Sequence, residues 1–145
     1  MSQHTTNIRA FAAAASSSDP VVSAYCGMVA IELVLKQAIG LPDHNVPSAL
    51  NLFAHRFAID NLRGCKVRLA SLSTQLSNAL KTISVQGKDG VARFAPAECY
   101  PYIRYTRHTC DGWTGPTTTQ EQAEMLAHIV NSTRSYLATK FQKAL

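Results

Sequence analysis

The segment DPVVSAYCGMVAIELVLKQAIG, residues 19–40, constrains the fold of this chain more than any other. Asp19 provides the side-chain acceptor of a helix N-cap, and Pro20 suits the first helical position, where a backbone N–H is not needed. Gly40 is the usual residue for ending a helix. Together these signals predict a helix roughly 30 Å long. Because apolar residues occupy most of its sides, we expect this helix to be buried among several others.

The same segment is long enough to cross a lipid bilayer. However, Glu32 and Lys36 lie inside it at a spacing that allows them to pair, and no second hydrophobic segment accompanies it. A charge near the middle of a membrane span is costly. We therefore interpret the segment as a central core helix and predict no membrane association.

Four other segments have apolar residues at helical spacing. They are residues 6–16, 45–59, 66–85 and 118–142. Thr118 and Glu121 have the spacing of a capping box at the start of the last segment. As an alternative to the end of the third segment, residues 82–86 and 91–94 would form a hairpin around the sequence GKDG. The pattern predicts one all-α domain over residues 1–145, an up-and-down bundle of four to five helices with a long crossover before the last.

Composition narrows the class of protein without deciding its function. With 145 residues, 46% apolar and 16% charged, the chain has enough material for one globular core. Its net charge of +5 is compatible with an anionic partner such as RNA or a nucleotide. Four cysteines are too few for a disulfide scaffold, so we expect a reducing cytoplasmic location.

No cofactor is predicted. The sequence has no glycine-rich phosphate loop. Cys99, His108 and Cys110 offer potential zinc ligands, but a fourth ligand at a suitable spacing is missing.

The crossover contains the most chemically suggestive residues, YPYIRYTRH at positions 100–108, with no carboxylate between Cys99 and Cys110. Arginine has a planar cationic group suited to phosphate, and tyrosine has a face on which a base can stack. The predicted ligand-binding residues are Tyr102, Arg104, Tyr105, Arg107 and His108. In the alternative interpretation, Tyr100 and Tyr102 hold the crossover against the bundle and the arginines are solvated.

Three segments in this order resemble the HEPN superfamily, small helical domains found beside nucleotidyltransferases and in toxin–antitoxin and phage-defence systems. They are AYCGMVAIELVLKQAIG at residues 24–40, HNVPSALNLF at residues 44–53, and YPYIRY at residues 100–105 followed by TQEQAEMLAHIVNSTRSYL. The first is similar to the long helix of the family, the second to its turn and following helix, and the third to the segment before its closing helix.

The resemblance implies several functions. Many HEPN domains are metal-independent ribonucleases whose arginine and histidine are separated by four to six residues, paired across a homodimer. Here Arg104 and His108 would take these catalytic roles, but only three residues separate them. Other members bind nucleotides or RNA, or are partners of a nucleotidyltransferase. We expect nucleotide or RNA binding first, ribonuclease activity second, and a non-catalytic scaffold or antitoxin-like module third.

A homodimer is expected for two reasons. The first is the resemblance, because HEPN ribonucleases act as homodimers. The second is that a central helix with apolar residues on most sides has more apolar surface than a few short helices can bury.

Overall fold

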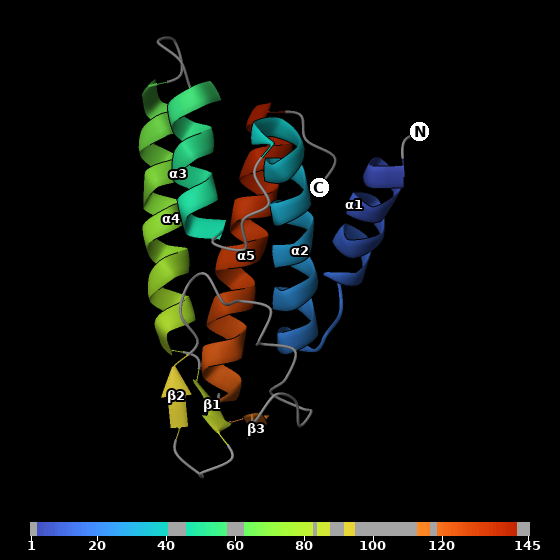
Figure 1. Ribbon diagram of the computed structural model, residues 1–145, viewed down its shortest axis with the longest axis vertical. Helices are drawn as coiled ribbons and strands as arrows, with labels where there is room; N and C mark the ends of the chain where they lie inside the picture. Colours follow the sequence, from blue (N-terminus) through green and yellow to red (C-terminus); the bar gives the residue numbers. More distant parts are fainter. Residues whose placement is uncertain are drawn as a thin grey trace.

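Five helices make up most of the computed structural model, which describes residues 3–40, 46–57, 63–82, 84–87, 92–94, 113–116 and 119–141. The helices are α1 (Gln3–Ala14), α2 (Pro20–Ile39), α3 (Val46–Phe57), α4 (Arg63–Thr82) and α5 (Gln120–Phe141). Three short strands, β1 (Ser84–Gly87), β2 (Ala92–Phe94) and β3 (Trp113–Pro116), form a small sheet at one end of the bundle (Figure 1). The predicted all-α class is confirmed, with this sheet as an addition to it.

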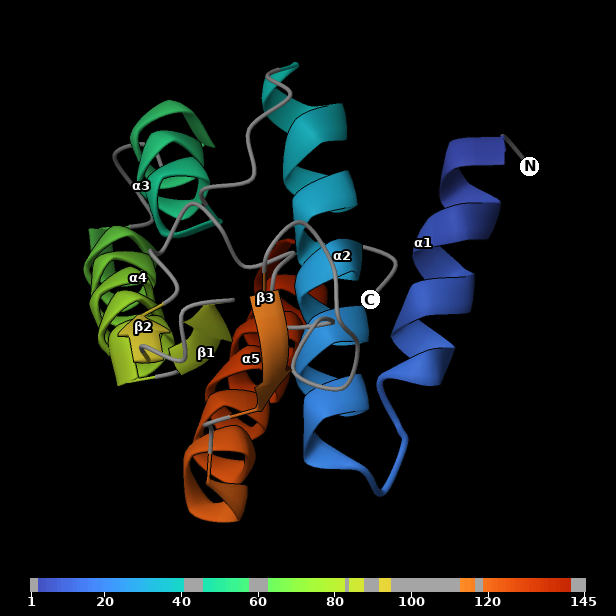
Figure 2. The same ribbon diagram turned by 60° about the horizontal axis from the view of Figure 1, so that its bottom comes forward.

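Helices α2 and α5 form the centre of the molecule. α2 packs against α1, α3 and α5, while α4 packs against both α3 and α5. The views in Figures 1 and 2 place α3 and α4 on one side of the central pair and α1 on the other. The predicted central position of α2 is therefore confirmed.

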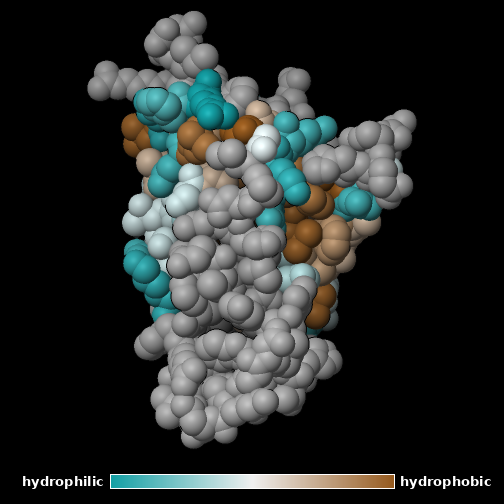
Figure 3. All heavy atoms as spheres, in the orientation of Figure 1, coloured by the Kyte–Doolittle hydropathy of each residue, from teal (hydrophilic) through white to brown (hydrophobic). Residues whose placement is uncertain are grey.

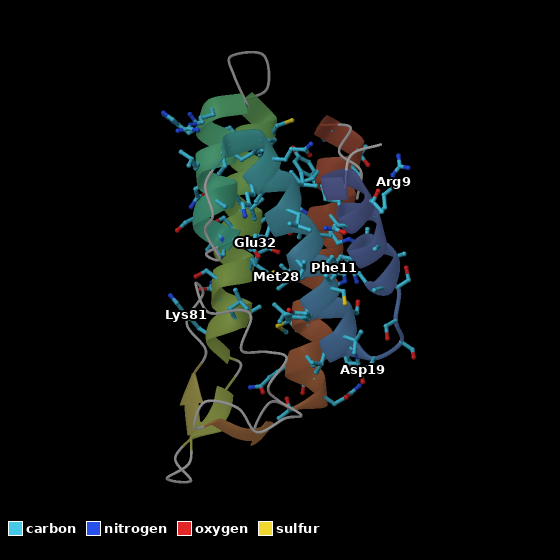
Figure 4. All side chains as sticks on the ribbon, turned by 45° about the vertical axis from the view of Figure 1, so that its right-hand side comes forward. Arg9, Phe11, Asp19, Met28, Glu32 and Lys81 are labelled. Carbon is cyan, nitrogen blue, oxygen red and sulfur yellow. The ribbon has the colours of Figure 1, made fainter. Side chains whose placement is uncertain are left out.

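The signals at both ends of α2 act as the sequence predicts. The Asp19 carboxylate accepts hydrogen bonds from the backbone N–H groups of Val21, at 2.9 Å, and Val22, at 3.2 Å. Figure 4 shows Asp19 at the end of α2 where the chain arrives from α1. Gly40 has a φ of 76°, which favours glycine, and its N–H donates to the Lys36 carbonyl at 2.7 Å.

The length and composition of α2 would also suit a membrane span. Half of its most hydrophobic window is buried inside the protein, where α1, α3 and α5 cover it. The core helix of a soluble protein passes the same test, and packing against α1, α3 and α5 accounts for the buried half of this window.

The strict up-and-down topology that we expected is wrong at one connection, because α2 and α3 run in the same direction (Figure 1). A hydrogen bond between their C-terminal ends agrees with this arrangement. Arg56, near the end of α3, donates from Nη1 to the carbonyl of Ile39, the last residue of α2, at 3.2 Å. This contact also satisfies a carbonyl that has no partner within its own helix.

The hairpin alternative describes the end of α4 better than a helix through residue 85. α4 ends at Thr82, and β1 pairs antiparallel with β2, placing Val85 opposite Arg93. Thr82, Ile83 and Val85 are β-branched, and such residues favour strands over helices. β3 pairs antiparallel with the other edge of β1, so the strand order is β2-β1-β3.

The capping box of α5 lies one residue later than predicted. The Thr119 hydroxyl accepts from the Gln122 N–H at 3.1 Å, and the Gln122 side chain accepts from the Thr119 N–H at 2.9 Å. Thr118 and Glu121 satisfy the same sequence pattern, so the pattern alone does not distinguish the two registers.

The core is formed by large buried side chains from all five helices. The largest fully buried side chains are Phe53, Ile8, Met28, Ile31, Leu35, Leu50, Leu69, Leu72, Leu76 and Leu80. α5 adds Leu126, Val130 and Leu137, which are also buried.

Candidate anionic-ligand groove

The residues that the sequence predicts to bind a ligand do not belong to the described part of the chain. Tyr102, Arg104, Tyr105, Arg107 and His108 all fall within residues 95–112. The crossover site, including the proposed catalytic pair Arg104 and His108, therefore stays a prediction. The candidate site that the structure does describe lies elsewhere, on the bundle itself.

A groove of about 510 Å³ runs along one face of α5 beside α4, and we call it the α4/α5 groove. Its described lining is Arg68, His128, Asn131, Ser132, Ser135, Tyr136, Thr139 and Lys140. All but Arg68 come from α5, at steps of one, three or four residues that keep them on one face of the helix. Arg68 reaches the groove from α4.

The described lining carries positive charge and no carboxylate. Three basic residues lie in this lining, Arg68, His128 and Lys140. None of them forms a salt bridge or a hydrogen bond with another residue that the structure describes. Glu124, one helical turn before His128, instead accepts a hydrogen bond from the Gln120 side chain at 3.1 Å. The three basic side chains are thus available to an anion from outside.

Hydroxyl groups lie between the basic residues. Ser132, Ser135 and Thr139 are partly or fully exposed, and they make no hydrogen bond within the described residues. Each hydroxyl can donate one hydrogen bond and accept others. Basic groups separated by hydroxyl donors are a suitable environment for phosphate oxygens.

Tyr136 forms the wall of the α4/α5 groove on the α4 side. Burial raises the pKa of its phenol to about 12, and a hydrogen bond with Cys65 and the nearby thiol contribute to the same shift. The positive charge of Arg68 acts in the opposite direction. Tyr136 is therefore a neutral hydrogen-bonding group at physiological pH.

We expect the Cys65→Ala variant to lower the pKa of Tyr136 toward its ordinary value of about 10, because it removes the hydrogen bond that favours the neutral phenol. In the wild type, the raised pKa means that folding stabilises protonated Tyr136. Its contribution to stability is complete below pH 10 and decreases as the pH rises toward 12. NMR titration of the tyrosine ring carbons, assigned with Tyr136→Phe, measures the shift. An unchanged pKa in Cys65→Ala would refute the role of the thiol.

On its other side, the groove is linked to α1 by a chain of hydrogen bonds that we call the Arg134 clasp. Arg134 donates from Nη1 to Asn131 Oδ1 at 2.7 Å and from Nη2 to the Ala12 carbonyl at 2.9 Å. Asn131 donates to the Ser23 hydroxyl at 3.3 Å, and Ser23 donates to the Ala15 carbonyl at 2.6 Å. The clasp holds the C-terminal end of α1 against α2 and α5, and it orients Asn131 in the groove.

A second groove, of about 330 Å³, lies between α3 and α4, and we call it the α3/α4 groove. Its described lining is Pro47, Ser48, Asn51, Ser73, Thr74, Ser77, Asn78 and Lys81. Lys81 is the single charged residue in this described lining. In Figure 3, much of this side of the molecule is pale to teal, in keeping with a polar surface.

Neither a search for metal sites nor comparison with known proteins assigns a function to these grooves. Among the described residues, no group of three histidine, cysteine or acidic side chains is placed to hold a metal ion. No family model matches the chain, and neither does any curated protein or solved structure. The site is therefore defined by its own chemistry, a basic, hydroxyl-rich groove on a five-helix bundle.

Proposed function

We propose that this protein binds a phosphate-bearing ligand, RNA or a nucleotide, through the α4/α5 groove. The observation that carries the proposal is the set of three basic side chains, Arg68, His128 and Lys140, without a carboxylate partner in the described lining. Neighbouring surface charges on a folded protein are commonly of mixed sign. A groove with one sign of charge attracts ligands of the other sign.

The charge distribution of the bundle supports this location. α4 contains Arg63, Lys66, Arg68 and Lys81 and no acidic residue, and α3 contains none either. The acidic residues of α5, Glu121 and Glu124, lie in its first two turns, far along the helix from Lys140. All charged side chains of α4 and of the second half of α5 are therefore basic.

We also propose that the bundle is a HEPN-like domain. Five helices with an apolar central helix agree with the resemblance of residues 24–40, 44–53 and 100–105 to that superfamily. A cytoplasmic location, a homodimer and a nucleotidyltransferase or antitoxin partner belong to the same proposal. Ribonuclease activity through Arg104 and His108 is the alternative, and it rests on the sequence motif alone. Binding is preferred because described residues support it.

The test is binding of fluorescently labelled single-stranded RNA, with ATP as a competitor, to an Arg68→Gln/Lys140→Gln variant. We expect binding to weaken about tenfold or more at low salt, because two phosphate contacts are lost. The slope of log K against log salt should decrease by about 1.4, since each contact to a single strand contributes about 0.7. Displacement by ATP would identify a nucleotide site, and resistance to ATP would identify RNA.

Lys36→Gln/Lys66→Gln is the matched control, because it removes the same charge from two exposed side chains outside the groove. This control should bind nearly as well as the wild type. Equal weakening in the two variants would show that net charge alone attracts RNA. Absence of binding to either probe by the wild type at low salt would refute the proposal.

A further inference from the structure

We propose that the α3/α4 groove is a second binding site, for a small polyhydroxylated anion of the sugar phosphate class. The two grooves share no lining residue among those described, so this proposal is independent of the α4/α5 groove. It is carried by a set of unused hydrogen-bonding groups that converge on one groove.

Four side chains in the groove have no partner among the residues that the structure describes. Asn51, Ser77, Asn78 and Lys81 form neither a hydrogen bond nor an ion pair within the described chain. Each carboxamide offers two donors and one acceptor, the hydroxyl offers both roles, and the ammonium offers three donors. Figure 4 shows Lys81 pointing outward from α4. These groups are therefore available to a ligand that is itself rich in donors and acceptors.

The groove has a fixed wall. Ser73, only 3% exposed, donates from its hydroxyl to the Pro47 carbonyl at 2.7 Å and so ties the middle of α4 to the start of α3. Pro47 has a restricted backbone, which adds to this rigidity. Ser48 and Asn51 from α3 are thereby held in one groove with Ser77 and Asn78 from α4.

The residue types on α4 are unusual for a surface that is merely solvated. From position 70 to position 78 the helix has no charged residue, although Thr74, Gln75 and Asn78 are exposed. Serine, threonine and asparagine are poorer helix formers than the lysine, glutamate and alanine typical of such positions. Leu72, Leu76 and Ala79 are buried and already supply the packing of this segment. Neither helix stability nor packing requires these polar residues, so a role in ligand binding is compatible with both.

The chemistry of the lining identifies the class of ligand. Amides and hydroxyls complement the hydroxyl groups of a sugar, and the single lysine complements one anionic group. The described lining contains no aromatic ring on which a base would stack. A volume of about 330 Å³ is near the lower limit for ligand pockets, which suits a monosaccharide phosphate better than a larger molecule.

The experiment is an NMR titration of the protein with ribose 5-phosphate, with ribose and inorganic phosphate as separate probes. We expect saturable shifts in the signals of Asn51, Ser77 and Asn78, and affinity about tenfold lower in Asn51→Ala/Asn78→Ala. Lys81→Gln should weaken ribose 5-phosphate and leave ribose unaffected. Gln37→Ala, an exposed amide on α2, is the control and should change nothing.

Two results would overturn the proposal. One is the absence of a saturable shift with ribose 5-phosphate at millimolar concentration. The other is an equal response to inorganic phosphate that persists in Asn51→Ala/Asn78→Ala, because simple attraction to Lys81 would then suffice. Since alanine favours helix, these variants should remain folded, and their amide spectra provide the check.

Discussion

Arg134→Met is expected to lower the free energy of unfolding by about 2 kcal/mol, because it removes the donor from two partly buried acceptors, at a cost of about 1 kcal/mol each. Asn131 Oδ1 and the Ala12 carbonyl both accept from the Arg134 guanidinium. Burial lowers the pKa of Arg134 from its very high ordinary value, which is consistent with a cation partly removed from water. Methionine preserves much of the side-chain length, so the effect reports the lost hydrogen bonds more than a cavity.

Urea denaturation measures this change, and Lys66→Met is the matched control because it removes an exposed cation from α4. The control should change the free energy by less than about 0.5 kcal/mol. Hydrogen exchange adds a local measurement, since protection should be lost first in α1, which the clasp holds. Unchanged exchange in α1 together with an unchanged unfolding free energy would show that the clasp contributes nothing.

Gly27→Leu is expected to lower the free energy of unfolding by more than about 3 kcal/mol, since it overfills a packed contact between two central helices. Gly27 is buried where α2 meets α5. A Cβ added there would overlap Val130 Cγ1 and lie 3.2 Å from Arg134 Cδ. Val130 is fully buried and β-branched, so its side chain cannot turn aside easily. The helices would have to separate, which would also strain the clasp.

Gly64→Leu provides the comparison, because a Cβ at that exposed position in the first turn of α4 meets no atom within 4 Å. This variant should be neutral or slightly stabilising, since leucine favours helix over glycine by up to about 1 kcal/mol. Adding Val130→Ala to the Gly27 variant should recover part of the loss in thermal or urea unfolding. Equal stability of the two glycine variants would contradict the close α2–α5 contact.

Local signals in the sequence were sufficient for much of the fold. Asp19, Pro20 and Gly40 mark the ends of α2 because each acts through its own backbone or its near neighbours. The same reasoning misplaced the capping box, where two overlapping matches differ by one residue. It also missed the shared direction of α2 and α3, since the periodicity of a helix does not encode how its axis is oriented against another.

The candidate site was less predictable for a physical reason. Sequence reasoning finds sites that are concentrated along the chain, such as residues 100–108, whereas the α4/α5 groove joins Arg68 to residues more than fifty positions away. His128 is exposed on α5, and its place in a basic groove depends on the packing of α4 beside it. The available signal was the spacing of His128, Ser132, Ser135 and Thr139, a polar face with no acidic residue.

The strand order β2-β1-β3 affects how well the protein tolerates changes in the length of the segment between β2 and β3. Phe94 ends β2 and Trp113 begins β3, and both strands flank β1. Phe94 lies opposite Ser84 at one end of β1, and Trp113 lies opposite Gly87 at its other end. With adjacent strands about 4.8 Å apart and a rise of about 3.3 Å per residue, the chain leaves the sheet and returns to it across a span of roughly 14 Å. The entropy cost of closing a loop on such a base grows only slowly with its length. We therefore expect changes in the length of residues 95–112 to cost little stability, because the two ends of that segment are held by strands that pair with β1.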